Sequence, residues 1–220
     1  MVVTLEEVKK NKKIQAFITA GDNNLKAMGF TDHSYRHVSL IATNASLILE
    51  KLGYPERQCQ LAAIAGYMHD IGNVVSRHDH GQSGAMLAYD LLTEMNMDPE
   101  EITEVIAAIG NHEEQYGHAV NPLAAALILA DKADVHRSRV RNRDVSTFDI
   151  HDRVNYGAEK ASLEIDPTEK TITMELKIDL EITTVMEYFE IFLDRMIMCR
   201  RAATFLGCSF GLIINEAKLL

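Results

Sequence analysis

The fold and the chemistry of this chain depend most on residues 61–73, which read Leu-Ala-Ala-Ile-Ala-Gly-Tyr-Met-His-Asp-Ile-Gly-Asn. A helix of small and apolar residues is predicted to lead directly to His69 and Asp70, and a turn follows them. Two polar side chains at the end of a buried helix cost free energy unless they bind a partner. A histidine that interacts with the helix C-terminus beside a solvated aspartate is the alternative, so the pair has to be interpreted in its context.

Four more segments carry histidine or aspartate in a setting that is predicted to be buried. They contain His37, His80, His112 and Asp131, in this order along the chain. His37 lies on the apolar face of a predicted helix over residues 32–52, and the small residues after His80 allow a helix to approach a neighbour closely. Asp131 interrupts an apolar helix, where a carboxylate is costly unless it binds a metal ion or a nearby arginine. Imidazoles and carboxylates in this number are suited to a pair of divalent metal ions.

Neighbouring residues leave some of these assignments open. His33 lies one helical turn before His37, and His78 lies two residues before His80. His112 follows an apolar helix and can instead interact with the negative end of that helix.

The five segments together resemble the HD superfamily of metal-dependent phosphohydrolases, over residues 33 to about 140. The first segment of that family selects His37 rather than His33, although Leu40 replaces its usual basic residue. The resemblance implies six metal ligands of the dinuclear type, namely His37, His69, Asp70, His80, His112 and Asp131. It implies that Asp70 bridges two ions, the first also held by His37, His69 and Asp131 and the second by His80 and His112. The chain departs from the similar HD-GYP cyclic-di-nucleotide phosphodiesterases, because Asn111 replaces a histidine and the Gly-Tyr-Pro triplet is missing.

The activity that this resemblance implies is hydrolysis of a phosphate mono- or diester in a nucleotide-like or other small molecule. A hydroxide that bridges the two ions would attack the phosphorus atom, with His69 and Asp70 as the central catalytic residues. Iron or manganese suits such ligands, and zinc, magnesium, nickel or cobalt are alternatives. The ligand set is also similar to that of mixed-valence di-iron oxygenases of this fold, and a non-catalytic nucleotide-binding sensor is a third hypothesis.

Charged residues beside these segments are candidates for contacts with the substrate or with the ligands. Lys132 and Arg137 follow Asp131 closely, and both are candidates to bind a substrate phosphate. Cations at the end of a helix are also favoured by its dipole without any ligand. Glu113, Glu114 and His118 are candidates to support a ligand or to donate a proton, although all three also suit a solvated surface.

Composition limits the partners of the chain. The formal charge of −10 over 220 residues argues against non-specific binding to nucleic acid or to an acidic membrane. The N-terminus lacks the layout of a signal peptide, and apolar runs stay far below the roughly 20 residues of a membrane span. A cytoplasmic location is therefore expected. The three cysteines are far apart in the sequence and are predicted to be reduced packing residues.

The pattern of apolar residues predicts a mainly α fold, an HD-type helical array over residues 1–155 with an α+β appendage over residues 156–220. Thr4 and Glu7 predict a capping box for a helix that continues toward Ala20 and ends at Gly21. Alternating apolar residues on both sides of a turn at 167–170 predict a hairpin. A helix from about 182 to Gly207 and a strand over 210–214 follow, and this appendage is expected to form a homodimer.

Overall fold

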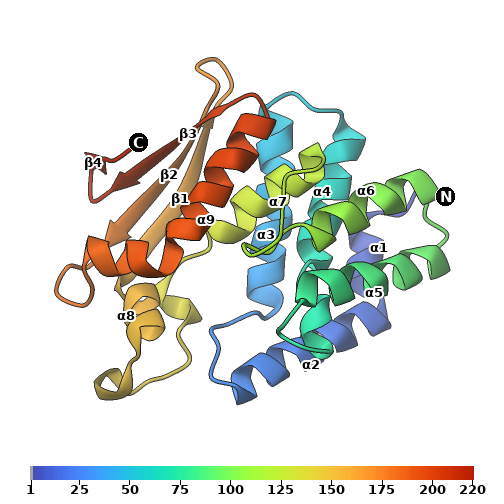
Figure 1. The fold of residues 1–220 in the computed structure, drawn as a ribbon. Coiled ribbons are helices and arrows are strands. Elements are labelled where there is room, and N and C mark those ends of the chain that lie inside the picture. Colours follow the sequence, from blue (N-terminus) through green and yellow to red (C-terminus); the bar gives the residue numbers. More distant parts are fainter. Residues whose placement is uncertain (1) are drawn as a thin grey trace.

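Seven α-helices form the helical array in the computed structural model, which describes residues 2–220 (Figure 1). They are α1 (Leu5–Lys10), α2 (Lys12–Ala27), α3 (Tyr35–Lys51), α4 (Glu56–Met68), α5 (His80–Glu94), α6 (Pro99–Gly110) and α7 (Pro122–Lys132). Local signals define several of their ends: Asp98 and Asn121 each cap the helix that begins at the following proline. The helical part of the predicted fold is therefore confirmed.

Helix α7 is the centre of the helical part. Every residue from Leu123 to Ala130 is buried, because α3, α4, α6 and the C-terminal helix α9 (Val185–Phe205) all pack against it. A helix that is apolar on all sides has to be enclosed in this way. Asp131 comes directly after these buried residues, so its carboxylate lies in the interior of the protein.

The predicted first helix is wrong in its extent. The capping box of Thr4 and Glu7 is present, but α1 ends at Lys10, where the side chain of Asn11 caps α2. Gly21 then lies inside α2 and does not end a helix. A Cβ atom on Gly21 would lie 3.3 Å from Asn73 Cβ and from the backbone nitrogen of Val74. The glycine therefore serves the close packing of α2 on the segment that follows the His-Asp pair.

A second glycine brings the segments that carry His37 and His69 together within the helical array. A Cβ atom on Gly66 of α4 would lie 2.9 Å from the Cα atom of Ala42 in α3, so the two helices are in contact through their backbones. Because His69 follows α4 and His37 lies on α3, this crossing places the two imidazoles side by side. A larger side chain at residue 66 would force these helices apart.

The C-terminal part is a sheet with one long helix, as predicted. The strands are β1 (Ala158–Asp166), β2 (Thr171–Ile178), β3 (Ser209–Ile214) and β4 (Ala217–Lys218), in the spatial order β1-β2-β3-β4. β1 pairs antiparallel with β2, and β3 pairs parallel with β2 because α9 connects them. The short strand β4 and helix α8 (Ile150–Gly157) were not predicted from the sequence.

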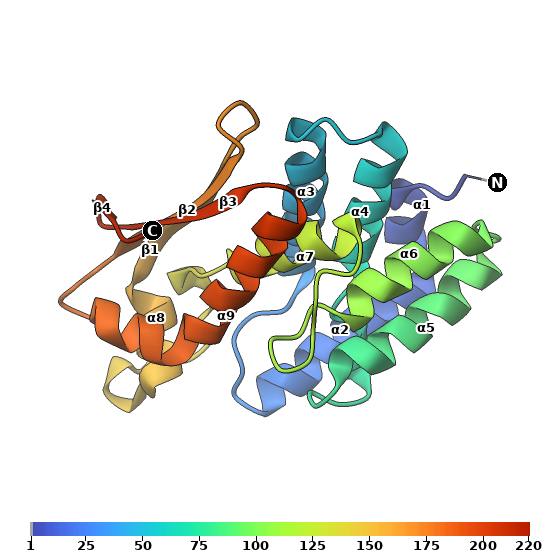
Figure 2. The same cartoon turned by 45° about the horizontal axis from the view of Figure 1, so that its top comes forward.

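Helix α9 lies between the sheet and the helical array (Figures 1 and 2). One face of the sheet presents alternating buried residues such as Met174 and Leu176, and the buried residues of α9 include Tyr188 and Cys199. Because α9 also contacts α7, the C-terminal part packs directly on the central helix. The proposed boundary between residues 155 and 156 stays a prediction.

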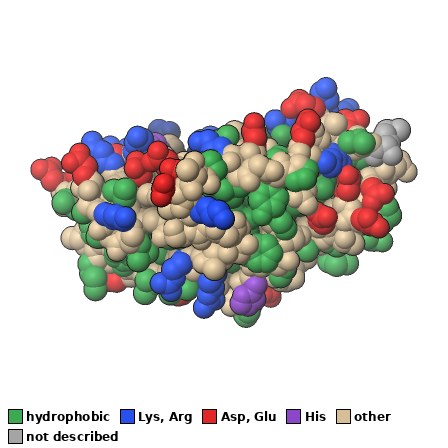
Figure 3. Space-filling model, turned by 90° about the horizontal axis from the view of Figure 1, so that it is seen from above, with side chains coloured by type: hydrophobic (Ala, Val, Ile, Leu, Met, Phe, Trp, Pro, Cys, Tyr) green, Lys and Arg blue, Asp and Glu red, His purple; other side chains and the backbone are tan. Residues whose placement is uncertain are grey.

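Charged side chains of both signs lie on the surface of the protein (Figure 3). On the face seen from above Figure 1, acidic and basic side chains are interspersed (Figure 3). None of the helices in residues 2–220 has the length and apolar character that crossing a bilayer requires. Cys59, Cys199 and Cys208 are all buried thiols, in agreement with a packing role, and burial raises the pKa of Cys199 to about 12.

Candidate metal centre

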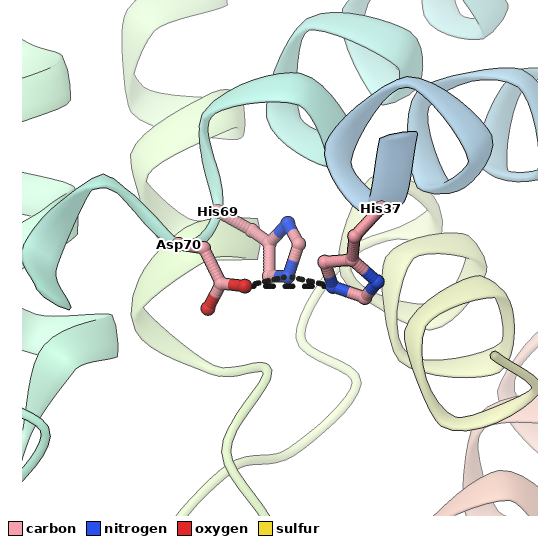
Figure 4. A group of neighbouring side chains, drawn as sticks. All are labelled: His37, His69 and Asp70. Carbon is pink, nitrogen blue, oxygen red and sulfur yellow. Dashed lines mark hydrogen bonds and ion pairs between the residues drawn. The ribbon is translucent and has the colours of Figure 1, made fainter. Parts of the chain in front are cut away.

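Five separate segments bring the six predicted ligands to one place in the protein interior. His37 comes from α3, His69 and Asp70 from the turn after α4, His80 from the first position of α5, His112 from the loop after α6, and Asp131 from α7. Figure 4 shows His37, His69 and Asp70 pointing toward one another. The four histidines and Asp70 are buried, and Asp131 is nearly so. The predicted residues are therefore together in space, which the order of segments alone could not guarantee.

The histidines share one orientation. In three of them Nδ1 lies within hydrogen-bonding distance of the carbonyl oxygen three residues earlier: His69 with Gly66 at 2.9 Å, His80 with Arg77 at 3.1 Å and His112 with Ile109 at 2.6 Å. A carbonyl oxygen only accepts, so Nδ1 carries the hydrogen and Nε2 keeps its lone pair. All three lone pairs are then available to a cation in the centre.

One oxygen of Asp70, Oδ2, is part of a first group of atoms that could each donate a lone pair to a metal ion. Asp70 Oδ2 lies 3.2 Å from His69 Nε2 and 3.4 Å from His37 Nε2. Asp131 Oδ1 lies 3.4 Å from the same His37 nitrogen and 3.6 Å from that of His69. Two imidazoles and two carboxylates thus surround one point.

The other oxygen of Asp70, Oδ1, is part of a second group of such atoms. Asp70 Oδ1 lies 3.3 Å from His80 Nε2, and that nitrogen lies 3.1 Å from His112 Nε2. Asn73 donates a hydrogen bond of 3.0 Å from Nδ2 to Asp70 Oδ1 and fixes the orientation of the carboxylate. Asp70 therefore lies between two groups of donors, as a bridging ligand would.

These contacts fit divalent cations better than they fit any arrangement of hydrogen bonds. Nitrogen lone pairs face each other at 3.3 Å between His37 and His69 and at 3.1 Å between His80 and His112. Asp70 Oδ2 is buried without a hydrogen-bond donor within residues 2–220. Ligands about 2.1 Å from a common ion lie roughly 3.0–3.4 Å from each other, which matches these separations. A cation would satisfy the lone pairs and the orphaned oxygen together.

A chain of charges supports Asp131 on the side away from the histidines, and it begins with the buried ammonium of Lys132. Lys132 Nζ lies 2.7 Å from Asp131 Oδ2 and 3.2 Å from Glu114 Oε1, and Arg195 Nε lies 2.8 Å from the same Glu114 oxygen. Burial alone would raise the pKa of Asp131, but the ammonium of Lys132 and the imidazoles that face the carboxylate hold it well below its usual value. Burial likewise opposes ionisation of Glu114, yet Lys132 and Arg195 lower its pKa to about 2. Both carboxylates are therefore ionised.

The structure gives the two predicted phosphate-binding residues other contacts. The ammonium of Lys132 is buried and engaged with Asp131 and Glu114. Arg137 lies 3.3 Å from Glu159 and over the ring of Tyr156, outside both donor groups. A direct role in substrate binding stays a prediction for both residues.

The residues that the sequence left as alternatives lie at different positions in the structure. The structure brings His37 and His80 into the donor groups, whereas His33 binds the carbonyl oxygen of Thr31 and His78 is exposed. Glu113 Oε1 lies 3.2 Å from His80 Nδ1, which is the supporting position predicted for it.

Asp134 is the supporting residue that sequence reasoning missed. Its Oδ2 atom lies 2.7 Å from Nδ1 of His37 and 2.9 Å from the guanidinium of Arg36. The Asp134 carboxylate thus accepts the Nδ1 hydrogen of His37 and leaves the Nε2 lone pair available, as backbone carbonyls do for the other three histidines. Its spacing of three residues from Asp131, on the continuation of a buried helix, was the available signal.

We expect the Asp134→Asn variant to bind the ion beside His37 about 10- to 100-fold more weakly, because the tautomer and orientation of His37 are no longer fixed by a carboxylate. Titration of metal-free protein against a competing chelator measures this change. Asp32→Asn is the matched control, since Asp32 also pairs with Arg36 (3.3 Å) but binds no histidine of the centre. Equal metal affinity in Asp134→Asn and the control would contradict the assignment.

Comparison with known proteins places the chain in a family. The sequence model of the HD domain matches residues 34–152, which is more than half of the chain, so the protein belongs to the HD domain family. The resemblance predicted from the sequence is thereby confirmed.

The chain is similar in sequence to an archaeal protein and in structure to a bacterial one. An uncharacterized protein of Methanocaldococcus jannaschii, MJ1020, is 28% identical over 197 residues, which cover 78% of this chain and 74% of that protein. A crystal structure of a predicted HD superfamily hydrolase from an uncultured Thermotogales bacterium shares 25% identity, with a TM-score of 0.46 over 61% of this chain and 75% of that one.

Proposed function

We propose that this protein is a phosphohydrolase that uses two divalent metal ions to cleave a phosphate ester of a nucleotide-like or other small molecule. The observation that carries the proposal is the position of Asp70, whose two oxygens face separate pairs of imidazoles. A carboxylate in this position is suited to hold two ions close together. Iron or manganese is the metal we expect from the mixture of imidazole and carboxylate ligands.

The roles of the protein groups follow from their contacts. Two ions held in this way would activate a water molecule as nucleophile and polarise the oxygens of a phosphate ester. Asp70 and Asp131 supply the anionic ligands, and Lys132 keeps Asp131 ionised and in place. Backbone carbonyls and Asp134 hold the four imidazoles with Nε2 directed inward, so that little reorganisation is required when ions bind.

Purification in the presence and absence of oxygen, followed by metal analysis and a phosphate-release screen, tests this proposal. We expect about two ions per chain and metal-dependent release of phosphate from at least one nucleotide or sugar phosphate. Oxygen consumption with an EPR signal of coupled Fe(II)/Fe(III), and no phosphate release, would identify an oxygenase instead. Tight nucleotide binding by fully metallated protein without any product would identify a sensor.

A further inference from the structure

A cavity of about 380 Å³ is lined by two residues that contact the candidate metal centre. Its wall includes His33, whose ring lies 5.4 Å from that of His37, and Arg77, whose Nη1 lies 3.4 Å from His80 Nε2. Each of these two lining residues thus contacts one histidine of a donor group, although His37 and His80 do not line the cavity themselves. This volume lies within the range of cavities that bind a small molecule.

Three arginines line the cavity, and they differ in how their nitrogens are used. Arg139 is fully engaged: it donates to the carbonyl oxygens of Asp134 (2.5 Å) and Asp32 (3.0 Å and 3.2 Å) and contacts His33. It is buried and holds two loops together. Arg139 is therefore assigned to the scaffold, because each of its three guanidinium nitrogens already donates to a group of the protein.

Arg77 and Arg195 keep donors available. Within residues 2–220, Arg77 has no carboxylate partner, and its one polar side-chain contact is the long one to His80. Arg195 uses Nε for Glu114, and neither terminal nitrogen has a hydrogen-bond partner in the described chain. A metal ion at His80 would compete for the same Nε2 lone pair and release the remaining contact of Arg77.

Aromatic rings hold both arginines without using their N–H groups. The guanidinium of Arg77 lies over the ring of Phe30, 5.6 Å from its centre, and that of Arg195 lies over Phe192 at 4.3 Å. Cation–π contact engages the flat face of the guanidinium, so the N–H groups in its plane stay directed outward. Planar donors of this kind match the oxygens of a phosphate group.

We propose that Arg77 and Arg195 bind the phosphate of a small phosphomonoester in this cavity, beside the metal centre. The inference rests on the proposed function, and it adds the substrate class and two specificity residues to it. Asp149, Asp152 and Asn155 line the cavity as well and offer acceptors and a donor to hydroxyl groups. A hydroxyl-bearing body, as in a sugar phosphate or a nucleoside monophosphate, complements this wall.

The proposal makes the C-terminal helix part of the substrate site. Arg195 lies on α9, far from the HD segments in sequence, and Glu114 connects it to Lys132 and thereby to the ligand Asp131. Glu114 is thus a positioning residue for the guanidinium. The C-terminal part then serves substrate recognition in addition to packing.

Phosphate binding and kinetics of the Arg77→Met and Arg195→Met variants test the inference, with Arg201→Met as the control. Arg201 is exposed on the same helix as Arg195. Calorimetric titration with inorganic phosphate, with and without added metal, should show a dissociation constant about 10- to 100-fold higher for each variant and unchanged for the control. KM for the best sugar phosphate or nucleoside monophosphate should rise by a similar factor, with metal content unchanged.

A conservative variant separates recognition from structure. Arg195→Lys keeps the charge beside Glu114 but presents a point charge instead of a planar fork, so its phosphate affinity should fall between wild type and Arg195→Met. Arg77 has no ion pair in residues 2–220, so Arg77→Met leaves no carboxylate unpaired and tests the site even if the Arg195 variants fold poorly.

The outcomes distinguish this inference from the proposed function. Phosphate dissociation constants and KM values that stay at the wild-type level in both methionine variants would overturn the inference while metal-dependent turnover still supported the function. Arginine-dependent phosphate binding by fully metallated protein without turnover on any ester would support the binding site and overturn the hydrolase.

Discussion

Replacement of Asp70 by asparagine is expected to remove both metal ions and to reduce phosphate release by more than about 100-fold. The amide has the shape of the carboxylate but no negative charge, and each of its two atoms would face lone pairs on histidine nitrogens. Loss of a supporting residue typically costs 10- to 100-fold in metal affinity, so loss of the shared ligand should cost more. Metal analysis after dialysis and a phosphate-release assay measure the two effects together.

Companion variants make the expectation for Asp70 specific. Asp131 Oδ1 lies 3.4 Å from His37 Nε2 and 3.6 Å from His69 Nε2, so Asp131→Asn should lose the ion on that side and keep the ion at His80. Asp90→Asn, exposed on the helix that begins with His80, should keep both. Two retained ions and normal turnover in Asp70→Asn would show that this carboxylate does not bridge a pair of metals.

The candidate ligands could be selected from the sequence because the relevant signals are local. A His-Asp pair after a run of small residues, or an aspartate after eight buried residues, is recognisable from its own neighbours. Helix starts such as Asn121-Pro122 and the capping box at Thr4 are equally local, and the structure confirms them. The alternation of apolar residues also defined strands β1 and β2 closely.

The remaining features depend on contacts between segments that are distant in sequence. Gly21 suits a helix end by its residue type, but the packing of α2 on the Asn73 segment keeps it inside a helix. Arg195 gave no signal as a site residue, because its connection to Glu114 and the cavity exists only when α9 packs on α7. Arg137, by contrast, is near Asp131 in sequence and yet lies against Glu159.

Replacement of Lys132 by methionine is expected to destabilise the metal-free protein by about 3–5 kcal/mol. The ammonium is buried and pairs with two carboxylates, Asp131 and Glu114, which would be left without it in the interior. For a chain of this size the melting temperature should fall by roughly 10 °C. Urea denaturation gives the free energy of unfolding, and Lys177→Met, at an exposed ion pair with Glu159, is the control with no measurable change.

The same variant separates the two interpretations of Lys132. If the ammonium bound substrate phosphate directly, as the sequence suggested, its loss would raise KM and leave the melting temperature unchanged. The buried ion pairs predict loss of stability first, and they predict that adding Glu114→Gln to Lys132→Met restores part of it, since a carboxylate that has lost one of its two cationic neighbours is then neutral. That second change also removes the anchor of Arg195. The double variant should therefore be more stable than Lys132→Met alone and yet bind phosphate more weakly. If the ion pairs served only the stability of the protein, the second substitution would not weaken phosphate binding.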